Sequence, residues 1–345
     1  MKKLLNTLYI TTENNYLHRD GDTIVVQSQE GNKVRFPIHN LESIICFGPV
    51  SISSPLMQLC GERGVYITLL SQYGKYYSRI EGPISGNVLL RRKQFKLVDD
   101  EIISLNTSKS IIIAKVMNSR NILLRALRDC KDYNQNQVVE IQKTIDYMYF
   151  LIHKIETSSS FDTVRGIEGE AARKYFEVFN NLILSQKEDF VFCSRNRRPP
   201  LDNVNAMLSF VYTLLAHDTC AALQSVGLDP AVGFFHVERP GRPSLALDLM
   251  EEFRAYLGDR LVLSLINRKQ VKGKGFIKTE SGSIQMDNTT RKTLIEAYQK
   301  RKQEEIEHPF IKEKIKIGLI PYVQSQLMAR FIRGDLEAYP PFFVR

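Results

Sequence analysis

Residues 16–47 read YLHRDGDTIVVQSQEGNKVRFPIHNLESIICF, and they decide the architecture of the first part of the chain. Short runs rich in β-branched and aromatic residues alternate there with turn signals at residues 20–22 (DGD) and 30–32 (EGN). Runs of this length and composition are typical of β-strands. The pattern continues on both sides, and the expected strands are residues 8–10, 16–18, 23–26, 33–36, 43–47, 65–70 and 76–80, with one helix over residues 54–62.

The chain changes character after residue 87, where most segments carry the apolar period of a helix. Residues 81–86 (EGPISG) form the expected linker between the two parts. The expected helices span residues 109–129, 137–154, 168–184, 203–226, 244–267, 289–303 and 310–332, the last one broken near Pro321. The sequence therefore predicts an α+β fold: a small N-terminal β-rich domain over residues 1–84, followed by a larger all-α domain over residues 85–345 that carries the candidate catalytic residues.

Composition narrows the functional classes. The 345 residues have a formal net charge of +9 and a pI near 9.2, which favours a polyanionic partner, although an ordinary basic protein has the same balance. The five cysteines are odd in number and show no CxxC spacing, which indicates reduced thiols in a cytoplasm. We expect no signal peptide and no membrane span. No Walker A sequence supports an ATPase, and no Ser-His-Asp order supports a serine hydrolase.

Glu168 stands out because of its place on a helix. We expect it to open a helix in the run 166–176 (GIEGEAARKYF), where counting by three and four aligns it with apolar residues such as Ala172 and Tyr175. The neighbouring Glu170 aligns instead with charged residues. A carboxylate on a buried stripe needs a partner, and a metal ion is one such partner. The alternative is a carboxylate that interacts with the helix dipole.

A second segment, residues 233–254, adds an imidazole and two carboxylates. His236 ends an apolar approach, a basic Arg-Pro-Gly-Arg-Pro loop follows, and Ser244 is the expected N-cap of the next helix. Asp248 and Glu251 are three residues apart and share one helix face. Mixed nitrogen and oxygen ligands suit Mg²⁺ or Mn²⁺ better than a thiolate-seeking ion. The alternatives are a histidine satisfied in the core and two carboxylates on a solvated face.

Several basic residues are candidates for binding a polyanion. Arg239 and Arg242 flank the proposed ligands, where they could hold a phosphate or form a salt bridge with a nearby glutamate. Arg198 precedes a Pro-Pro turn, and Arg91 follows the linker, so each could contact backbone phosphates or simply be solvated. Tyr175 lies near Glu168 and could position a phosphate or a water, although core packing is the simpler role for it. Residues 268–286 are basic at their start and have a candidate hairpin tip at residues 280–282 (ESG), and they could form either a phosphate-binding loop or a solvated one.

These segments together resemble the CRISPR-associated adaptation nuclease, the "Cas-one" integrase subunit. The matching pieces spread over nearly the whole chain, and they are residues 86–94 (GNVLLRRKQ), 166–176, 198–209 (RPPLDNVNAMLS), 227–236 (GLDPAVGFFH) and 248–254 (DLMEEFR). The ending at residues 333–342 (RGDLEAYPPF) resembles the subtype I-C branch of that family.

The resemblance implies a metal site and an activity. In the family the metal ligands are a Glu, a His and a carboxylate three residues past an Asp, which here are Glu168, His236 and Glu251, with Asp248 supporting a ligand or lying near DNA. It implies a DNA endonuclease and integrase that uses Mg²⁺ or Mn²⁺. Such an enzyme inserts short foreign DNA segments into a CRISPR array through attack of a 3′-hydroxyl on a phosphodiester, and it can also cleave DNA. It further implies a homodimer that assembles with the small "Cas-two" partner.

Two other functions remain open at this stage. A DNA- or RNA-binding protein without catalytic activity would use the same carboxylates structurally, and it would bind in a salt-sensitive way without a metal. A metal-dependent phosphohydrolase would use the His217-Asp218 pair, but no second His-Asp set supports this.

Overall fold

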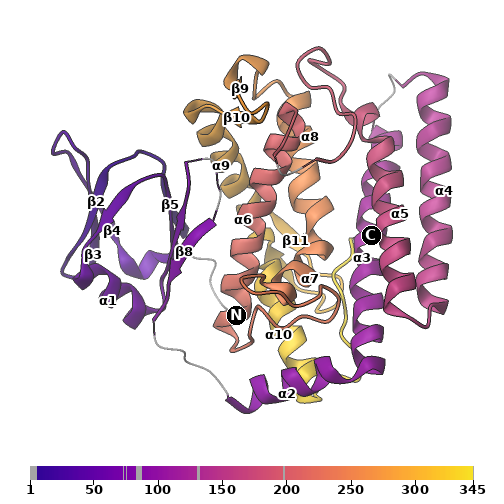
Figure 1. The fold of residues 1–345 in the computed structure, drawn as a ribbon, viewed down its shortest axis with the longest axis horizontal. Helices are drawn as coiled ribbons and strands as arrows, with labels where there is room; N and C mark the ends of the chain where they lie inside the picture. The colour runs from indigo at the N-terminus through magenta and orange to yellow at the C-terminus, as the bar shows by residue number, and fades with distance from the viewer. Residues whose placement is uncertain are drawn as a thin grey trace. The chain divides into compact units, whose positions relative to one another are not determined.

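The computed structural model describes residues 6–72, 74, 76–82, 88–129, 133–196 and 199–344. The chain separates into two compact units, Met1–Ser85 and Gly86–Arg345, which are described separately below. Most of the expected linker, residues 81–86, lies outside the described residues. Figure 1 shows the strand-rich first unit in indigo and violet and the helical second unit in the later colours.

The first unit contains two four-stranded sheets. One has the order β1 (Asn6–Ile10), β5 (Leu41–Phe47), β7 (Tyr66–Leu70) and β8 (Tyr76–Ile80), with β1, β5 and β7 parallel. The other has the order β4 (Lys33–Pro37), β3 (Thr23–Gln27), β2 (Asn15–Asp20) and β6 (Val50–Ile52). Strand β6 was not predicted, because three residues are too few to show an alternating pattern.

A single apolar cluster holds the first unit together. Helix α1 (Ser54–Arg63) buries Leu56 and Leu59 against strand residues such as Leu17, Ile24 and Ile44. These side chains come from alternate positions of the strands, as expected for sheets with one buried face. The helix ends at Gly64, whose φ of 67° is a left-handed conformation that glycine adopts without strain.

The second unit is mainly helical. Its helices are α2 (Val88–Asp99), α3 (Glu101–Asp129), α4 (Gln135–Thr157), α5 (Phe161–Glu177), α6 (Asn203–Ser225), α7 (Ser244–Phe253), α8 (Arg260–Asn267), α9 (Asn288–Gln303) and α10 (Ile320–Arg333), with a π-helical turn, Arg254–Asp259, between α7 and α8. Helices α3, α4 and α5 pack against one another, and α7 packs against α3. Helix α6 is long and apolar enough to span a bilayer by length and composition, but 67% of its most apolar 18-residue stretch is buried inside the protein.

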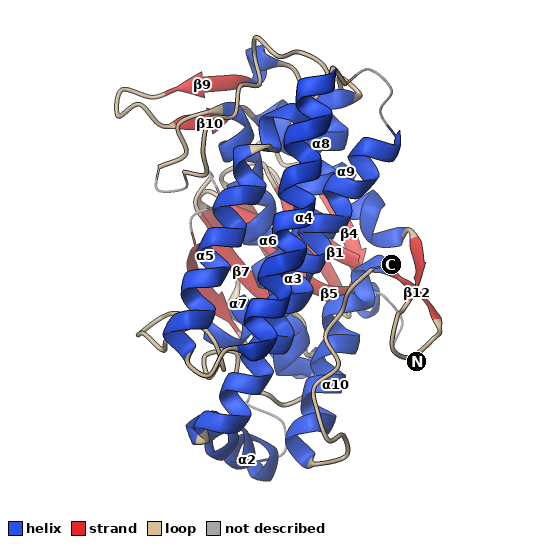
Figure 2. Cartoon of the chain, turned by 90° about the vertical axis from the view of Figure 1, so that its right-hand side faces the viewer, coloured by secondary structure: helices blue, strands red, loops and turns tan. Residues whose placement is uncertain are grey.

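The α+β fold class is confirmed, although the helical unit is not purely α. Two short antiparallel hairpins interrupt it, formed by β9 (Phe276–Lys278) with β10 (Ile284–Met286) and by β11 (Glu305–Glu307) with β12 (Lys314–Lys316). Figure 2 shows β9 and β10 as a red hairpin at one end of this unit. Pro321 does not break a helix, because it lies at the start of α10, where its missing N–H costs nothing.

Three predicted helix starts are wrong, because α3 begins at Glu101 in place of residue 109, α10 begins at Ile320 in place of residue 310, and α5 begins before residue 168. Helix α5 begins at Phe161, capped by Ser160, whose hydroxyl accepts a hydrogen bond from the Thr163 N–H at 3.2 Å. Glu168 therefore lies mid-helix and cannot act through the dipole of the first turn. Ser244 is not an N-cap either, because α7 already includes it and follows Pro243 without a side-chain cap. The Ser244 hydroxyl lies 3.4 Å from the Val237 carbonyl oxygen, to which it donates.

Candidate metal centre

Two of the predicted ligands meet around a lysine that was not predicted. Glu168 from α5 and Glu251 from α7 both form ion pairs with the ammonium group of Lys115 from α3. The contact to Glu251 measures 2.9 Å between Nζ and Oε2. The Lys115 side chain is 8% exposed and that of Glu168 is 23% exposed, so the group lies at the edge of the core. Three helices that are distant in sequence thus bring two carboxylates to one point.

Glu251 is buried and still ionised. Its other oxygen, Oε1, accepts a hydrogen bond from Arg254 Nη1 at 3.0 Å. Burial by itself raises the pKa of Glu251, but Arg254, Lys115 and His236 together outweigh burial and lower the pKa to about 2. Glu251 therefore carries a negative charge at neutral pH.

Asp248 fixes the orientation of His236. It is fully buried, and its Oδ1 lies 2.7 Å from His236 Nδ1. The backbone N–H groups of Phe234, Phe235 and His236 also donate to this carboxylate, at 2.7, 3.0 and 2.9 Å. A carboxylate is an acceptor only, so Nδ1 carries the hydrogen and Nε2 keeps a free lone pair. At Gly233 a Cβ atom would lie 2.6 Å from Asp248 Oδ2, so only glycine lets the loop approach this closely.

The donor set fits Mg²⁺ or Mn²⁺ in chemistry, although the side chains do not form a closed cluster. Glu251 Oε2 is buried and accepts no hydrogen bond of acceptable geometry, despite its ion pair with Lys115. Two carboxylates and one imidazole nitrogen suit these ions. In the described part of the chain, however, no three His, Cys, Asp or Glu side chains converge closely enough to hold a metal. Lys115 occupies the space between the two carboxylates, and the metal assignment stays a prediction.

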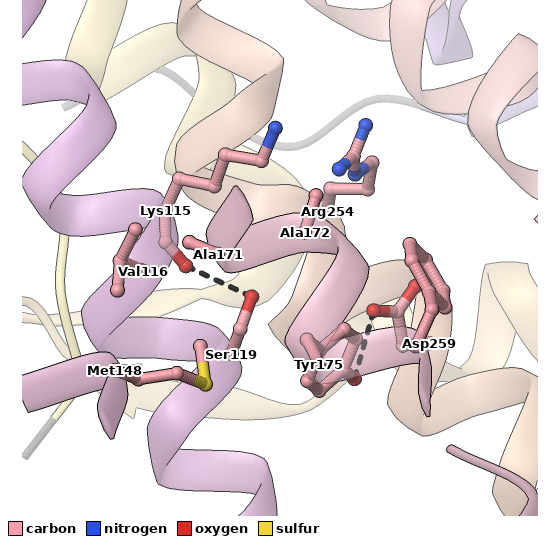
Figure 3. A pocket seen from close by; sticks show the side chains of 10 residues that line it. Lys115, Val116, Ser119, Met148, Ala171, Ala172, Tyr175, Arg254 and Asp259 are labelled. Carbon is pink, nitrogen blue, oxygen red and sulfur yellow. Dashed lines mark hydrogen bonds between the residues drawn. The ribbon is translucent and has the colours of Figure 1, made fainter. Parts of the chain in front are cut away.

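Tyr175 belongs to a buried network beside this site. Its hydroxyl donates to Asp259 at 3.0 Å, and the Tyr212 hydroxyl donates to the same carboxylate. Burial raises the pKa of Tyr175 well above its ordinary value, so the phenol stays a donor. Figure 3 shows Tyr175 and Asp259 lining a small pocket together with Lys115 and Arg254. Tyr175 is 3% exposed, so its contacts are with protein groups.

The predicted phosphate-binding arginines do not reach the carboxylates. Arg239 is exposed in the loop before α7, and Arg242 donates to the Val237 carbonyl at 3.3 Å. The salt bridge to Glu251 considered for these arginines is made by Arg254 instead. Arg91 lies on α2 and is partly exposed, and Arg198 lies outside the described residues.

Sequence reasoning missed Lys115 and Arg254 as residues of the site. Lys115 is flanked on its helix face by the buried residues Ile111, Ile112 and Asn118. A charge among buried positions is the same signal that singled out Glu168, and it was available in the sequence. Arg254 follows Glu251 by three residues, a spacing that favours an ion pair on a helix.

The His217-Asp218 pair has a structural role. Asp218 accepts hydrogen bonds from Lys302 Nζ and from the Tyr298 hydroxyl, both at 2.8 Å. These contacts tie α6 to α9 and leave Asp218 with cationic and phenolic partners in place of a metal. The structure therefore disfavours the phosphohydrolase alternative.

Comparison with known proteins identifies relatives along the whole chain. The family model for CRISPR associated protein Cas1 matches residues 8–300. The "CRISPR-associated endonuclease Cas1 1" of Chlorobaculum tepidum is 47% identical over 345 residues and covers 100% of both chains. The "CRISPR-associated endonuclease Cas1 2" of Rhodospirillum rubrum is 49% identical over 347 residues and covers 99% of both.

Solved structures share the fold. A casposase bound to an integration product superposes with a TM-score of 0.84 at 23% identity, covering 97% of this chain and 93% of the casposase chain. A CAS1 protein from Thermotoga maritima gives a TM-score of 0.82 at 20% identity, with coverage of 96% and 97%. At these identities the likeness establishes the architecture alone.

Proposed function

The chain belongs to the CRISPR-associated Cas1 family, and from that premise we propose that it is a metal-dependent DNA endonuclease and integrase of CRISPR adaptation. In this role it inserts short foreign DNA segments as new spacers into a CRISPR array, and it also cleaves DNA. The single observation that carries the proposal is full-length similarity, at 47% and 49% identity, to proteins named as CRISPR-associated endonucleases. The ending at residues 333–342 further supports placement in the subtype I-C branch.

Glu168, His236 and Glu251 would hold the Mg²⁺ or Mn²⁺ ion. When bound, the ion supplies a Lewis acid at the scissile phosphate. Asp248 presents the imidazole with its Nε2 lone pair free, since Nδ1 is hydrogen-bonded to the carboxylate. Arg254 keeps Glu251 ionised, so this ligand needs no deprotonation before the ion enters.

One site can serve both reactions because they have the same chemistry. In integration the 3′-hydroxyl of incoming DNA attacks phosphorus, and in cleavage water attacks it. Each attack is in line with the leaving oxygen and needs no covalent intermediate on the protein. Arg239 is exposed near the end of the loop that carries His236, and there it would offset negative charge on the phosphate.

The proposal extends to partners and compartment. The net charge of +9 favours DNA as the polyanion. We also propose a homodimer that assembles with the small Cas2 partner. Family membership supports this assembly, and one structural neighbour is titled "Cas6-RT-Cas1--Cas2 complex". The described Cys46, Cys60, Cys193 and Cys220 form no disulfide with one another, which supports a cytoplasmic location.

The test uses Glu168→Gln and His236→Ala in strand transfer and cleavage of branched and duplex DNA, with Mg²⁺, Mn²⁺ or EDTA. We expect each variant to lose about 100-fold or more of activity, because losing a ligand removes several kcal/mol of transition-state stabilisation. DNA binding and the melting temperature should change little. Glu177→Gln is the matched control, since it changes a carboxylate on the same helix that pairs with Arg173 and Lys174. Activity that survives in EDTA, or in folded Glu168→Gln, would contradict the proposal.

One observation favours a second function. Lys115 and Arg254 neutralise Glu168 and Glu251 within the protein, as expected for carboxylates that only stabilise a fold. A nucleic-acid-binding protein without catalysis would then bind DNA in a salt-dependent way. In that case Glu168→Gln would lower stability, and metal would change neither binding nor DNA integrity.

A further inference from the structure

One ammonium group stands where two carboxylates converge. Lys115 Nζ is within ion-pair distance of Glu168 Oε1 and lies 2.9 Å from Glu251 Oε2. The three residues come from three different helices: Lys115 is on α3, Glu168 is on α5 and Glu251 is on α7. The contacts therefore depend on the packing of three helices, and the lysine bridges them.

Such an arrangement needs a reason, because burying charge is costly. Two carboxylates that face one point repel each other, and a cation between them offsets that repulsion. The Lys115 side chain is 8% exposed, so its charge has lost most of its hydration and needs anionic partners of this kind. The single positive charge of Lys115 thus offsets part of the repulsion between the two carboxylates, as a divalent cation would with two charges.

A second cation, Arg254, also pairs with Glu251. Arg254 Nη1 holds the other oxygen of Glu251, and the guanidinium lies 5.2 Å from the centre of the Tyr212 ring. With Lys115 on Oε2, both oxygens of Glu251 face a cation. An incoming metal ion therefore competes with these two cations for the carboxylate.

Lys115 is the cation that can move. Arg254 is fixed by a planar guanidinium stacked near an aromatic ring, by its ion pair and by its place beside Glu251 on the same helical segment. The lysine reaches the site through a flexible four-carbon stem. The ends of Lys115 and Arg254 lie on the same side of the small pocket in Figure 3, and Lys115 forms part of its lining.

We propose that Lys115 is an internal counter-cation that takes the place of the metal between Glu168 and Glu251 in the metal-free protein, so that divalent metal binds by displacing its ammonium group. This inference rests on the proposed function, since it assigns a role at the same metal site. It makes Lys115 a residue that sets metal affinity, and it explains how the carboxylates stay in place before metal arrives.

The first test measures Mn²⁺ binding to the full-length protein without DNA, by titration with electron paramagnetic resonance of free Mn²⁺. Lys115→Met keeps most of the stem volume and removes the charge. We expect the variant to bind Mn²⁺ at least about tenfold more tightly than wild type, because the competing cation is gone. Lys109→Met is the control, since Lys109 is on the same helix and its ammonium donates to the Glu156 carbonyl. The control should bind Mn²⁺ as wild type does.

The second test needs no variant and covers the case in which Lys115→Met does not fold without metal. Wild-type protein is treated with an amine-acylating reagent in EDTA and in Mg²⁺, and the modification of Lys115 is read by mass spectrometry. Displacement predicts several-fold more modification of Lys115 in Mg²⁺, with no change at Lys109. Equal modification in both conditions would overturn the inference.

The outcomes separate this inference from the proposed function. If wild type binds Mn²⁺ and folded Lys115→Met binds it equally or more weakly, the displacement is wrong while the metal site stands. If neither protein binds Mn²⁺, both the displacement and the metal-dependent function are wrong. If Lys115→Met only weakens DNA binding, the lysine contacts phosphate and is not a counter-cation.

Discussion

Replacing Asp248 by Asn is the sharpest test of how the loop at His236 is held. Asp248 accepts four hydrogen bonds: Oδ2 from the N–H groups of Phe234 and Phe235, and Oδ1 from the N–H of His236 and from its Nδ1. Asparagine keeps one oxygen and replaces the other with an NH₂ group. Either the two donors at Oδ2 or the two donors at Oδ1 must then face another donor. The structure therefore allows only two orientations of the amide.

The two orientations differ in cost. If NH₂ faces Phe234 and Phe235, two buried N–H groups lose their acceptor, at roughly 1–3 kcal/mol each. If NH₂ faces His236, one N–H loses its acceptor, and the ring adapts by moving its hydrogen from Nδ1 to Nε2. The second orientation is cheaper, so we expect Asp248→Asn to lower the free energy of unfolding by about 1–3 kcal/mol. That loss is small beside a typical total of about 5–15 kcal/mol, and the protein should stay folded.

The expected change in tautomer has a functional consequence. An imidazole with hydrogen on Nε2 cannot offer that nitrogen to a metal, and loss of such a supporting carboxylate lowers metal affinity by about 10–100-fold. Urea unfolding measures the stability, ¹⁵N correlation spectra of His236 report the tautomer, and Mn²⁺ titration gives the affinity. Asp162→Asn, which changes an exposed carboxylate on α5, is the control. A variant with wild-type stability and an unchanged tautomer would refute this account of the loop.

Two further predictions concern the buried groups behind the site. Burial lowers the pKa of His308 to about 4, below its unfolded value near 6.5, so the unfolded chain binds the extra proton and stability should fall by up to about 3 kcal/mol as pH drops from about 6.5 to 4. Urea unfolding at pH 7.5 and 5 measures this loss. If the free energy of unfolding of His308→Gln falls equally between these pH values, the prediction is contradicted. Asn118→Ala should cost about 3 kcal/mol or more, because the Asn118 amide donates to the carbonyls of Glu252 and Phe342 at 2.7 and 2.9 Å and accepts from the Val344 N–H at 2.9 Å. Hydrogen exchange at residues 342–344 should rise in that variant, and unchanged protection there would show that the tail is held by other contacts.

Local patterns in the sequence predicted most of the secondary structure, because they reflect forces that act within a few residues. Alternation of apolar residues and glycine-containing turns predicted strands at residues 23–26 and 33–36, each one residue short of the observed β3 and β4, which pair as a hairpin. A helical apolar period predicted α4, α6 and α9 to within a few residues of their ends. Glu168 was noticed for a local reason too, since a carboxylate on an apolar stripe departs from that period.

Errors arose where a weak local signal competed with a stronger one nearby. The start of α5 was placed seven residues late, although Ser160 caps it at Phe161. A glycine such as Gly166 lowers helix propensity by about 1 kcal/mol, but the cap and the burial of Val164 and Ile167 outweigh that cost. The hairpin β11–β12 was missed, because its strands of three residues are too short for a period to show. The hairpin tip expected at residues 280–282 does lie between β9 and β10.

The sequence by itself singled out the carboxylates Glu168, Asp248 and Glu251 and predicted the helices that carry them, because these depend on local spacing. The tertiary structure alone decided that Lys115 lies between Glu168 and Glu251 and that Arg254 takes the remaining oxygen. Lys115 and Glu168 are 53 residues apart, and no periodic pattern links them. They meet because α5 and α7 each bury an apolar face against α3, which fixes the depth and rotation of each helix. Because the packing removes these charges from most of the solvent, each one needs an oppositely charged partner.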